Sequence, residues 1–101
     1  MIAKLKYGIG REVVVPVSTD NLVRLSKRTL QEGLQDLLDD VTDDPHRTVP
    51  AIREAAADPR SVVEVKTPEG YLPLEQETPL SDVFRAHKSL EILVSRPHAG
   101  G

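Results

Sequence analysis

The N-terminal segment has the pattern of a β-hairpin, and this pattern constrains most strongly how the chain can fold. Two strand-like runs, residues 2–7 and 12–17, flank a short loop that contains Gly8, Ile9 and Gly10. Alternating or β-branched runs around a short glycine-containing loop are typical of a hairpin. Since proline cannot donate to a sheet ladder, we expect the nitrogen of Pro16 to face away from the partner strand.

A helical segment follows the hairpin, and two starting points compete. Residues 18–21 are all favourable N-cap types, and leucine and valine then recur at helical spacing from Leu22 to Val41. Thr29 and Glu32 also match a capping box, so the helix could instead begin near Leu30. Residues 39–44, four of which are aspartates, end the helix. Because a helix C-terminus carries partial negative charge, we expect this acidic loop to be frayed and solvated.

The remaining sequence predicts a second helix and three more strands. A short helix runs from Thr48 to Ala57, with Pro50 near its first turn. Residues 61–67, 71–74 and 90–94 read as strands, with a helical turn at 78–84. This order predicts an α+β domain with a mixed sheet of four to five strands and one main helix on one face. We expect the last strand to lie between the first and the third, as in a β-grasp fold.

Composition limits the classes of function. A chain of 101 residues makes one domain, and with three aromatic residues its core is built from valine, leucine and isoleucine. The lack of cysteine excludes disulfides and thiolate chemistry within this chain. A net charge of −3 argues against a nucleic-acid partner. No apolar run has the length of a membrane span or the position of a signal sequence, so we expect a cytoplasmic monomer that does not bind membranes.

Several segments together resemble ubiquitin and its relatives. Residues 1–17 are similar to the first hairpin of ubiquitin without a gap, including a lysine at position 6 and a glycine at position 10. Residues 78–82 are similar to its Thr-Leu-Ser-Asp turn, and residues 89–94 are similar to its last strand. The sequence also ends in Gly100 and Gly101, and the resemblance covers about two-thirds of the chain. It implies a β-grasp domain over residues 1–95 and a flexible tail over 96–101.

Three features depart from ubiquitin. Residues 39–60 form an insertion, which contains the acidic loop and the short helix. Residues 96–99 stand where ubiquitin has alternating arginine and leucine. Residues 62–74 are too divergent from ubiquitin to place its apolar recognition face on this chain. The insertion suggests a separate, prokaryotic branch of the family. The different tail puts in doubt the use of the eukaryotic activating enzymes.

The resemblance implies a protein modifier that is not itself an enzyme. In that family an ATP-dependent adenylating enzyme activates the terminal carboxylate, here that of Gly101, and Gly100 gives access to it. A cysteine of that enzyme takes the acyl group, which a conjugating enzyme passes to a lysine of a target protein, and a deconjugating protease removes it. The resemblance implies no cofactor, and the histidines show no metal-ligand spacing. Acceptors for further copies would be Lys4, Lys6, Lys27, Lys66 and Lys88.

Four further residues are candidates for binding a partner. Arg96 could make a charge-assisted contact with an acidic patch of the activating enzyme, or it could be a solvated charge in the tail. Ile9, Leu93 and Val62 are candidates for an exposed apolar patch, although single exposed apolar side chains are ordinary. Two other functions stay open. One is a sulfur carrier with a terminal thiocarboxylate, and the other is a non-covalent ubiquitin-like interaction domain of a larger protein.

Overall fold

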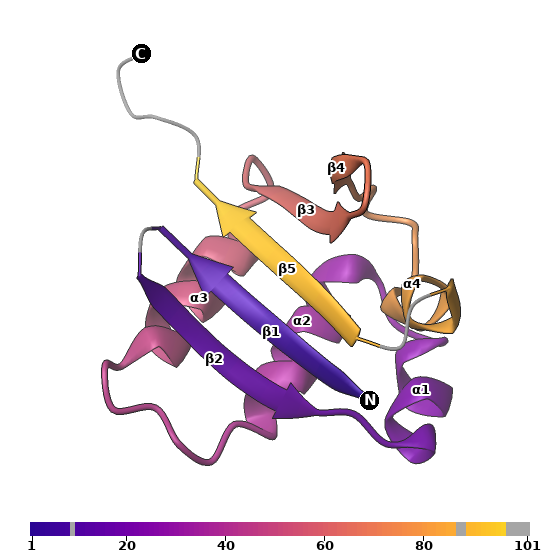
Figure 1. Ribbon diagram of the computed structural model, residues 1–101, viewed down its shortest axis with the longest axis horizontal. Coiled ribbons are helices and arrows are strands. Elements are labelled where there is room, and N and C mark those ends of the chain that lie inside the picture. The colour runs from indigo at the N-terminus through magenta and orange to yellow at the C-terminus, as the bar shows by residue number, and fades with distance from the viewer. Residues whose placement is uncertain (9, 87–88, 97–101) are drawn as a thin grey trace.

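A five-stranded mixed sheet forms the centre of the computed structural model, which describes residues 1–8, 10–86 and 89–96 (Figure 1). Its strands are β1 (Ile2–Tyr7), β2 (Arg11–Pro16), β3 (Val62–Thr67), β4 (Gly70–Pro73) and β5 (Ser89–Ser95). They lie in the order β2-β1-β5-β3-β4, with β1 and β5 parallel and the other neighbouring pairs antiparallel. The predicted place of the last strand, between the first and the third, is confirmed. The arrangement is compatible with a β-grasp fold.

Pro16 lies on the edge strand β2, as its chemistry requires. The Val17 amide donates to the Met1 carbonyl at 2.8 Å, and Ile2 is the neighbour of Pro16 in the register. Because hydrogen-bonded and non-bonded pairs alternate along an antiparallel ladder, the pair of Ile2 and Pro16 exchanges no ladder bonds. The nitrogen of Pro16 therefore faces the open edge, which confirms the prediction from the sequence.

Both competing helix starts are used, so the prediction of one main helix after the hairpin is wrong. α1 (Thr19–Leu25) begins at a capping box formed by Ser18 and Asn21. α2 (Leu30–Asp39) begins at a second box formed by Thr29 and Glu32. The first turn of a helix leaves backbone amides unpaired, and each capping box satisfies these amides at one helix start. Two boxes therefore mark two separate helices, and the chain turns between them. The structure also contains α3 (Thr48–Ala57) and α4 (Leu80–Ala86), which makes four helices in the described residues.

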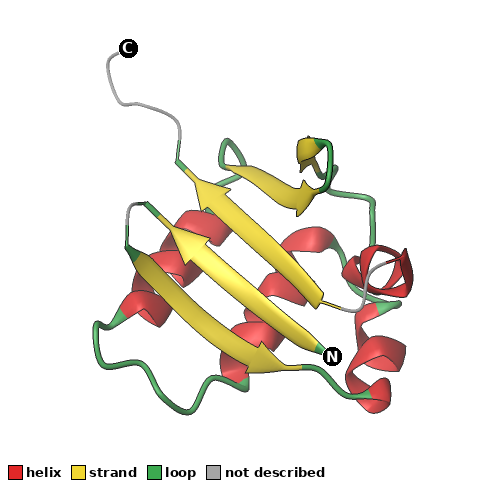
Figure 2. Ribbon diagram, in the orientation of Figure 1, coloured by secondary structure: helices red, strands yellow, loops and turns green. Residues whose placement is uncertain are grey.

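The helix of segment 39–60, α3, packs directly on the sheet. α3 contacts β1, β2 and β5, whereas α2 packs mainly against α3 and α4 (Figures 1 and 2). The inward side of α3 consists of Ile52, Ala55 and Ala56, all buried. Alanines let the helix backbone come close to the strands. The predicted short second helix is thus a full partner of α2, and both helices are ten residues long.

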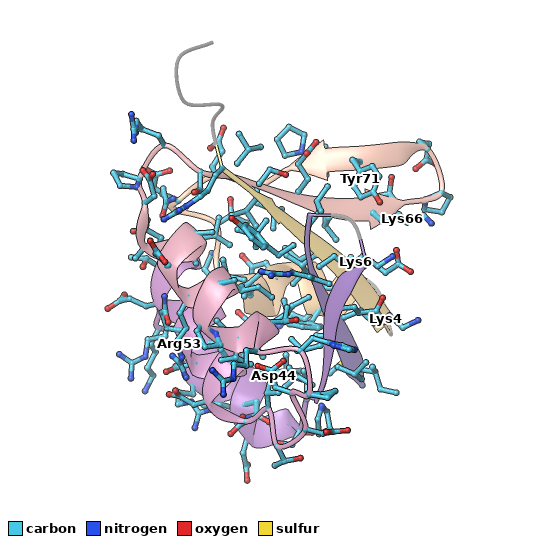
Figure 3. All side chains as sticks on the ribbon, turned by 90° about the vertical axis from the view of Figure 1, so that its left-hand side faces the viewer. Lys4, Lys6, Asp44, Arg53, Lys66 and Tyr71 are labelled. Carbon is cyan, nitrogen blue, oxygen red and sulfur yellow. The ribbon has the colours of Figure 1, made fainter. Side chains whose placement is uncertain are left out.

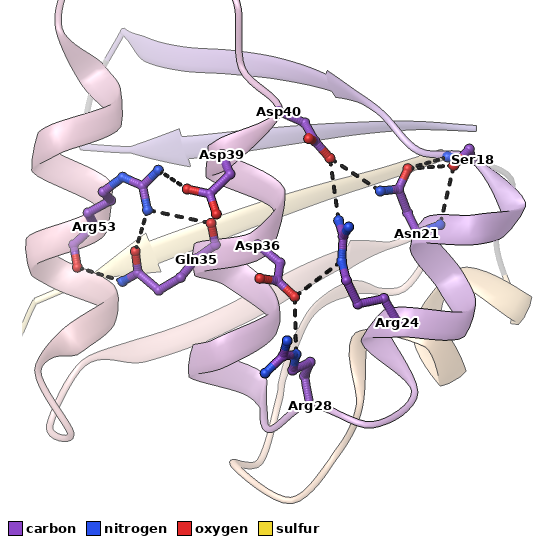
Figure 4. Close-up of polar contacts among 9 residues, drawn as sticks. All are labelled: Ser18, Asn21, Arg24, Arg28, Gln35, Asp36, Asp39, Asp40 and Arg53. Carbon is purple, nitrogen blue, oxygen red and sulfur yellow. Dashed lines mark hydrogen bonds and ion pairs between the residues drawn. The ribbon is translucent and has the colours of Figure 1, made fainter.

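The acidic loop is more ordered than the sequence indicates. The carboxylate of Asp44 accepts hydrogen bonds from the amides of Thr48 at 2.7 Å and Val49 at 2.8 Å, so it caps α3. Asp39 pairs with Arg53 of α3, and Asp40 pairs with Arg24 of α1 (Figure 4). These cations offset the unfavourable position of carboxylates at the C-terminus of α2. The expectation of a frayed loop is therefore wrong for these three residues, whereas Asp39 and Asp40 are exposed to solvent as expected.

The core lies between the sheet and the helices and is mostly aliphatic. Its only fully buried aromatic residue among the described positions is Phe84 of α4. Gly33 of α2 gives space to neighbouring side chains, since a Cβ there would lie 3.3 Å from side-chain atoms of both Leu25 and Leu80. Across residues 1–8, 10–86 and 89–96, none of the helices has the length and apolar character needed to cross a membrane.

Candidate functional site

The face of the sheet opposite the helices is open, and strand alternation decides which side chains lie on it. Residues at every second position point to the same face. The register aligns Val14, Lys4 and Glu91 in one row across β2, β1 and β5, and places Lys6 beside Leu93 in the next row. Figure 3 shows Lys4, Lys6, Lys66 and Tyr71 on this side and Arg53 and Asp44 in the helical layer. We call this side of the sheet the open face.

A network of opposite charges occupies the middle of the open face. The Lys6 Nζ lies 3.3 Å from a carboxylate oxygen of Glu91 and 3.9 Å from one of Glu12. The Lys66 Nζ lies 3.7 Å from the same Glu91 oxygen. The hydrogen bond from Lys6 lowers the pKa of Glu91 and, in turn, the bond to Glu91 raises the pKa of Lys6. Lys6 and Glu91 therefore both stay charged over a wider pH range than they would without this bond.

Two of the three predicted apolar candidates lie on the open face. Val62 is 47% exposed and pairs with Ser95, while Leu93 is partly buried and pairs with Glu64, so the two are diagonal neighbours on adjacent strands. Leu93 lies between Lys6 and Glu64 in its row. A single apolar side chain between charged neighbours makes a mixed surface. Ile9 lies outside the described residues.

Three other apolar side chains lie on the same face and were not predicted from the sequence. Ile2, Val14 and Tyr71 are each about half exposed. The period-two pattern of residues 2–7 and 12–17 was sufficient to put Ile2 and Val14 on the face opposite Ala3, Val13 and Val15, which are buried. Tyr71 carried no such signal, since the four residues of β4 are all exposed.

The last described residue of the chain, Arg96, is held by a helix. Its guanidinium lies 3.1 Å from a carboxylate oxygen of Glu54 on α3, and this hydrogen bond raises the pKa of Arg96. A hollow beside it is lined by Tyr7, Gly8, Val94, Ser95 and Arg96. The contact of Arg96 with a partner stays a prediction. Gly100 and Gly101 lie outside the described residues.

The candidate acceptor lysines differ in their surroundings. Lys6 and Lys66 share Glu91, whereas Lys4 and Lys27 are exposed. Lys88 lies outside the described residues. Within the part of the chain that the structure describes, no three histidine, aspartate or glutamate side chains are grouped to hold a metal ion.

Comparisons of the chain with protein-family models, with curated proteins and with solved structures find no match. The structure belongs to the α+β class, with a five-stranded mixed sheet and four helices among its described residues. Any assignment of function therefore depends on the geometry and chemistry of the chain itself.

Proposed function

We propose that this chain is a ubiquitin-like protein modifier whose Gly101 carboxylate is activated by an ATP-dependent adenylating enzyme and joined to lysine amines of other proteins. One observation carries the proposal. The strand order is β2-β1-β5-β3-β4, so the last strand is the central one and leads directly into the segment that contains Gly100 and Gly101. Because β5 pairs with β1 on one side and β3 on the other, a partner could bind the following segment without unfolding the domain.

The chemistry at this end suits a substrate of other enzymes. Gly100 and Gly101 have no Cβ, so they can lie extended in a narrow slot, and Pro97 favours an extended backbone before them. The folded body supplies the surface by which an activating enzyme, a conjugating enzyme and a deconjugating protease recognise the modifier. The open face, with its mixture of charged and apolar side chains, is the surface that we assign to this recognition.

The test is to detect the branched product. An N-terminally tagged chain is expressed in cells of the source organism, purified under denaturing conditions and digested with trypsin. Because trypsin cleaves poorly between Arg96 and Pro97, the branch on a target lysine will begin after Lys88 and comprise residues 89–101. A second form with Ala99→Arg shortens this branch to Gly-Gly. Deletion of Gly101 should remove all conjugates, and Asp43→Ala is the control that keeps them.

Other results would contradict the modifier function. A terminal mass increased by the replacement of oxygen with sulfur, without branched peptides, indicates a sulfur carrier. A native reading frame that continues past Gly101 without cleavage indicates an interaction domain of a larger protein. Absence of both the branch and the mass change in cells that contain the tagged chain also overturns the proposal.

A further inference from the structure

A groove with apolar walls lies between strand β4 and helix α4, away from the open face. Its walls include Leu72, Leu74, Val83 and Ala86, and its rim includes Glu75 and Asp82. It encloses about 390 Å³. Leu72 pairs with the buried Val65 and so lies on the helical side of the sheet, yet it is 55% exposed. An apolar side chain this exposed beside a hollow is available for contact with another molecule.

The backbone of β4 offers hydrogen bonds along the same groove. The Leu74 amide donates to the Val63 carbonyl at 2.8 Å, and the register pairs Leu72 with Val65. Because bonded pairs alternate along an antiparallel ladder, Tyr71 turns both its amide and its carbonyl outward. Pro73 turns its carbonyl the same way and has no amide to leave unpaired. Among the described residues no strand pairs with this edge of β4.

The charged side chains that line the groove are acidic. They are Glu75 and Asp82, and no lysine or arginine is among the described lining residues. Arg85 lies 3.7 Å from Asp82 and offsets part of its charge, whereas Lys66, the cross-strand neighbour of Tyr71, pairs with Glu91 on the open face. Such a field attracts a segment that carries lysine or arginine and disfavours an acidic one.

We propose that this groove binds an extended segment of another protein, with alternating apolar side chains flanked by lysine or arginine, which adds as a strand to β4. Addition of a strand to a sheet edge obtains affinity from main-chain bonds and specificity from pockets for alternate side chains. Tyr71 would supply one donor and one acceptor, Pro73 one acceptor, and Leu72 the apolar contact. This proposal is independent of the modifier function, since it does not involve Gly101.

The experiment uses a synthetic probe and its charge-reversed twin. The probe is the blocked peptide Lys-Lys-Val-Ile-Val-Lys-Lys, and the twin has glutamate at every lysine position. Each is titrated into the ¹⁵N-labelled full chain and followed by NMR. We expect the basic peptide to shift the amides of residues 71, 72, 74 and 82–86 and to bind at least about tenfold more tightly than the twin. Added salt should weaken this binding.

Three variants with matched controls test the contacts. Leu72→Ser should weaken binding about tenfold, whereas Val14→Ser, a change of similar exposure on the far edge, should have no effect. Tyr71→Pro removes the outward amide without breaking the ladder and should weaken binding more than Tyr71→Ala does. Glu75→Lys combined with Glu77→Lys should reverse the preference toward the acidic twin, whereas Glu12→Lys should leave the preference unchanged.

Four results would overturn the proposal. They are equal binding of the two peptides, shifts that map to the open face or to β2, no binding of the basic peptide at millimolar concentration, and equal effects of Tyr71→Pro and Tyr71→Ala. Circular dichroism of each variant establishes that it is folded before its affinity is compared with that of the unmodified chain.

Discussion

The two edges of the sheet have similar backbones but different neighbours. Each edge strand carries a proline at a position that does not bond to its partner, Pro16 on β2 and Pro73 on β4. At β2 the side chains that face the helices, Val13 and Val15, are buried beneath α3. At β4 the equivalent Leu72 is 55% exposed, because α3 packs against β1, β2 and β5. The position of one helix is therefore reflected in which edge carries an exposed apolar side chain on its helical side.

The largest expected effect tests whether α3 makes this difference. Ile52 of α3 is fully buried, so Ile52→Ala should reduce the free energy of unfolding by about 3 kcal/mol. Leu72→Ala should reduce it by less than about 1 kcal/mol, because much of that side chain is already in water. Urea denaturation of both variants measures the two changes. Similar losses would mean that the two edges are equally covered.

A smaller change tests what holds α3 in place. Asp44→Ala removes the carboxylate that accepts the amides of Thr48 and Val49, and should cost about 1 kcal/mol of stability. Asp43→Ala, in the same loop, is the control and should change stability by less than about 0.5 kcal/mol. Equal effects of the two substitutions in urea denaturation would show that Asp44 does not cap the helix.

The charge network on the open face lies between the two edges and should respond to pH in a defined direction. The pKa of Glu91 is lowered from its ordinary value of 4.5 chiefly by the hydrogen bond from Lys6. Its stabilising contribution is therefore complete above pH 4.5 and is lost as the pH falls through the lowered pKa. In an NMR titration, Lys6→Met should raise the pKa of Glu91 toward 4.5. No change after Lys6→Met, or an equal change after Lys27→Met, would contradict the assignment.

The smallest effect is expected where β5 leaves the sheet beside α3. Arg96 and Glu54 form a pair on the surface, and such pairs contribute little to stability because water and salt screen them. Arg96→Ala should thus lower the free energy of unfolding only slightly, and high salt should reduce the difference. A larger loss that salt does not change would mean that Arg96 acts through packing.

The sheet could be predicted from the sequence because strand signals are local. Alternation in residues 2–7, the β-branched run up to Val17 and the turn at 68–70 place the strands, and short connections limit their order. The same alternation puts Val62 and Leu93 on the open face.

The role of the helices could not be predicted, because it depends on tertiary contacts. Leucine spacing continues from Leu22 to Val41, so it does not show the break before Leu30. α3 is rich in alanine and lacks the strong apolar stripe of a core helix, although small side chains suit close packing on strands. Between Asp44 and the helix that it caps, Arg47 has φ 53°, a backbone conformation that non-glycine residues rarely adopt. The aspartates at 39, 40, 43 and 44 do not indicate in the sequence which of them caps the helix.

Amide hydrogen exchange at the two sheet edges tests the central claim most directly. In the free chain we expect the Leu72 amide to be protected by Val65, and the outward amides of Tyr71 and Val14 to exchange rapidly. With the basic peptide present, exchange should slow at Tyr71 and stay rapid at Val14. Protection of Tyr71 in the free chain, or equal slowing at both edges, would contradict an open β4 edge that selects an extended, basic segment.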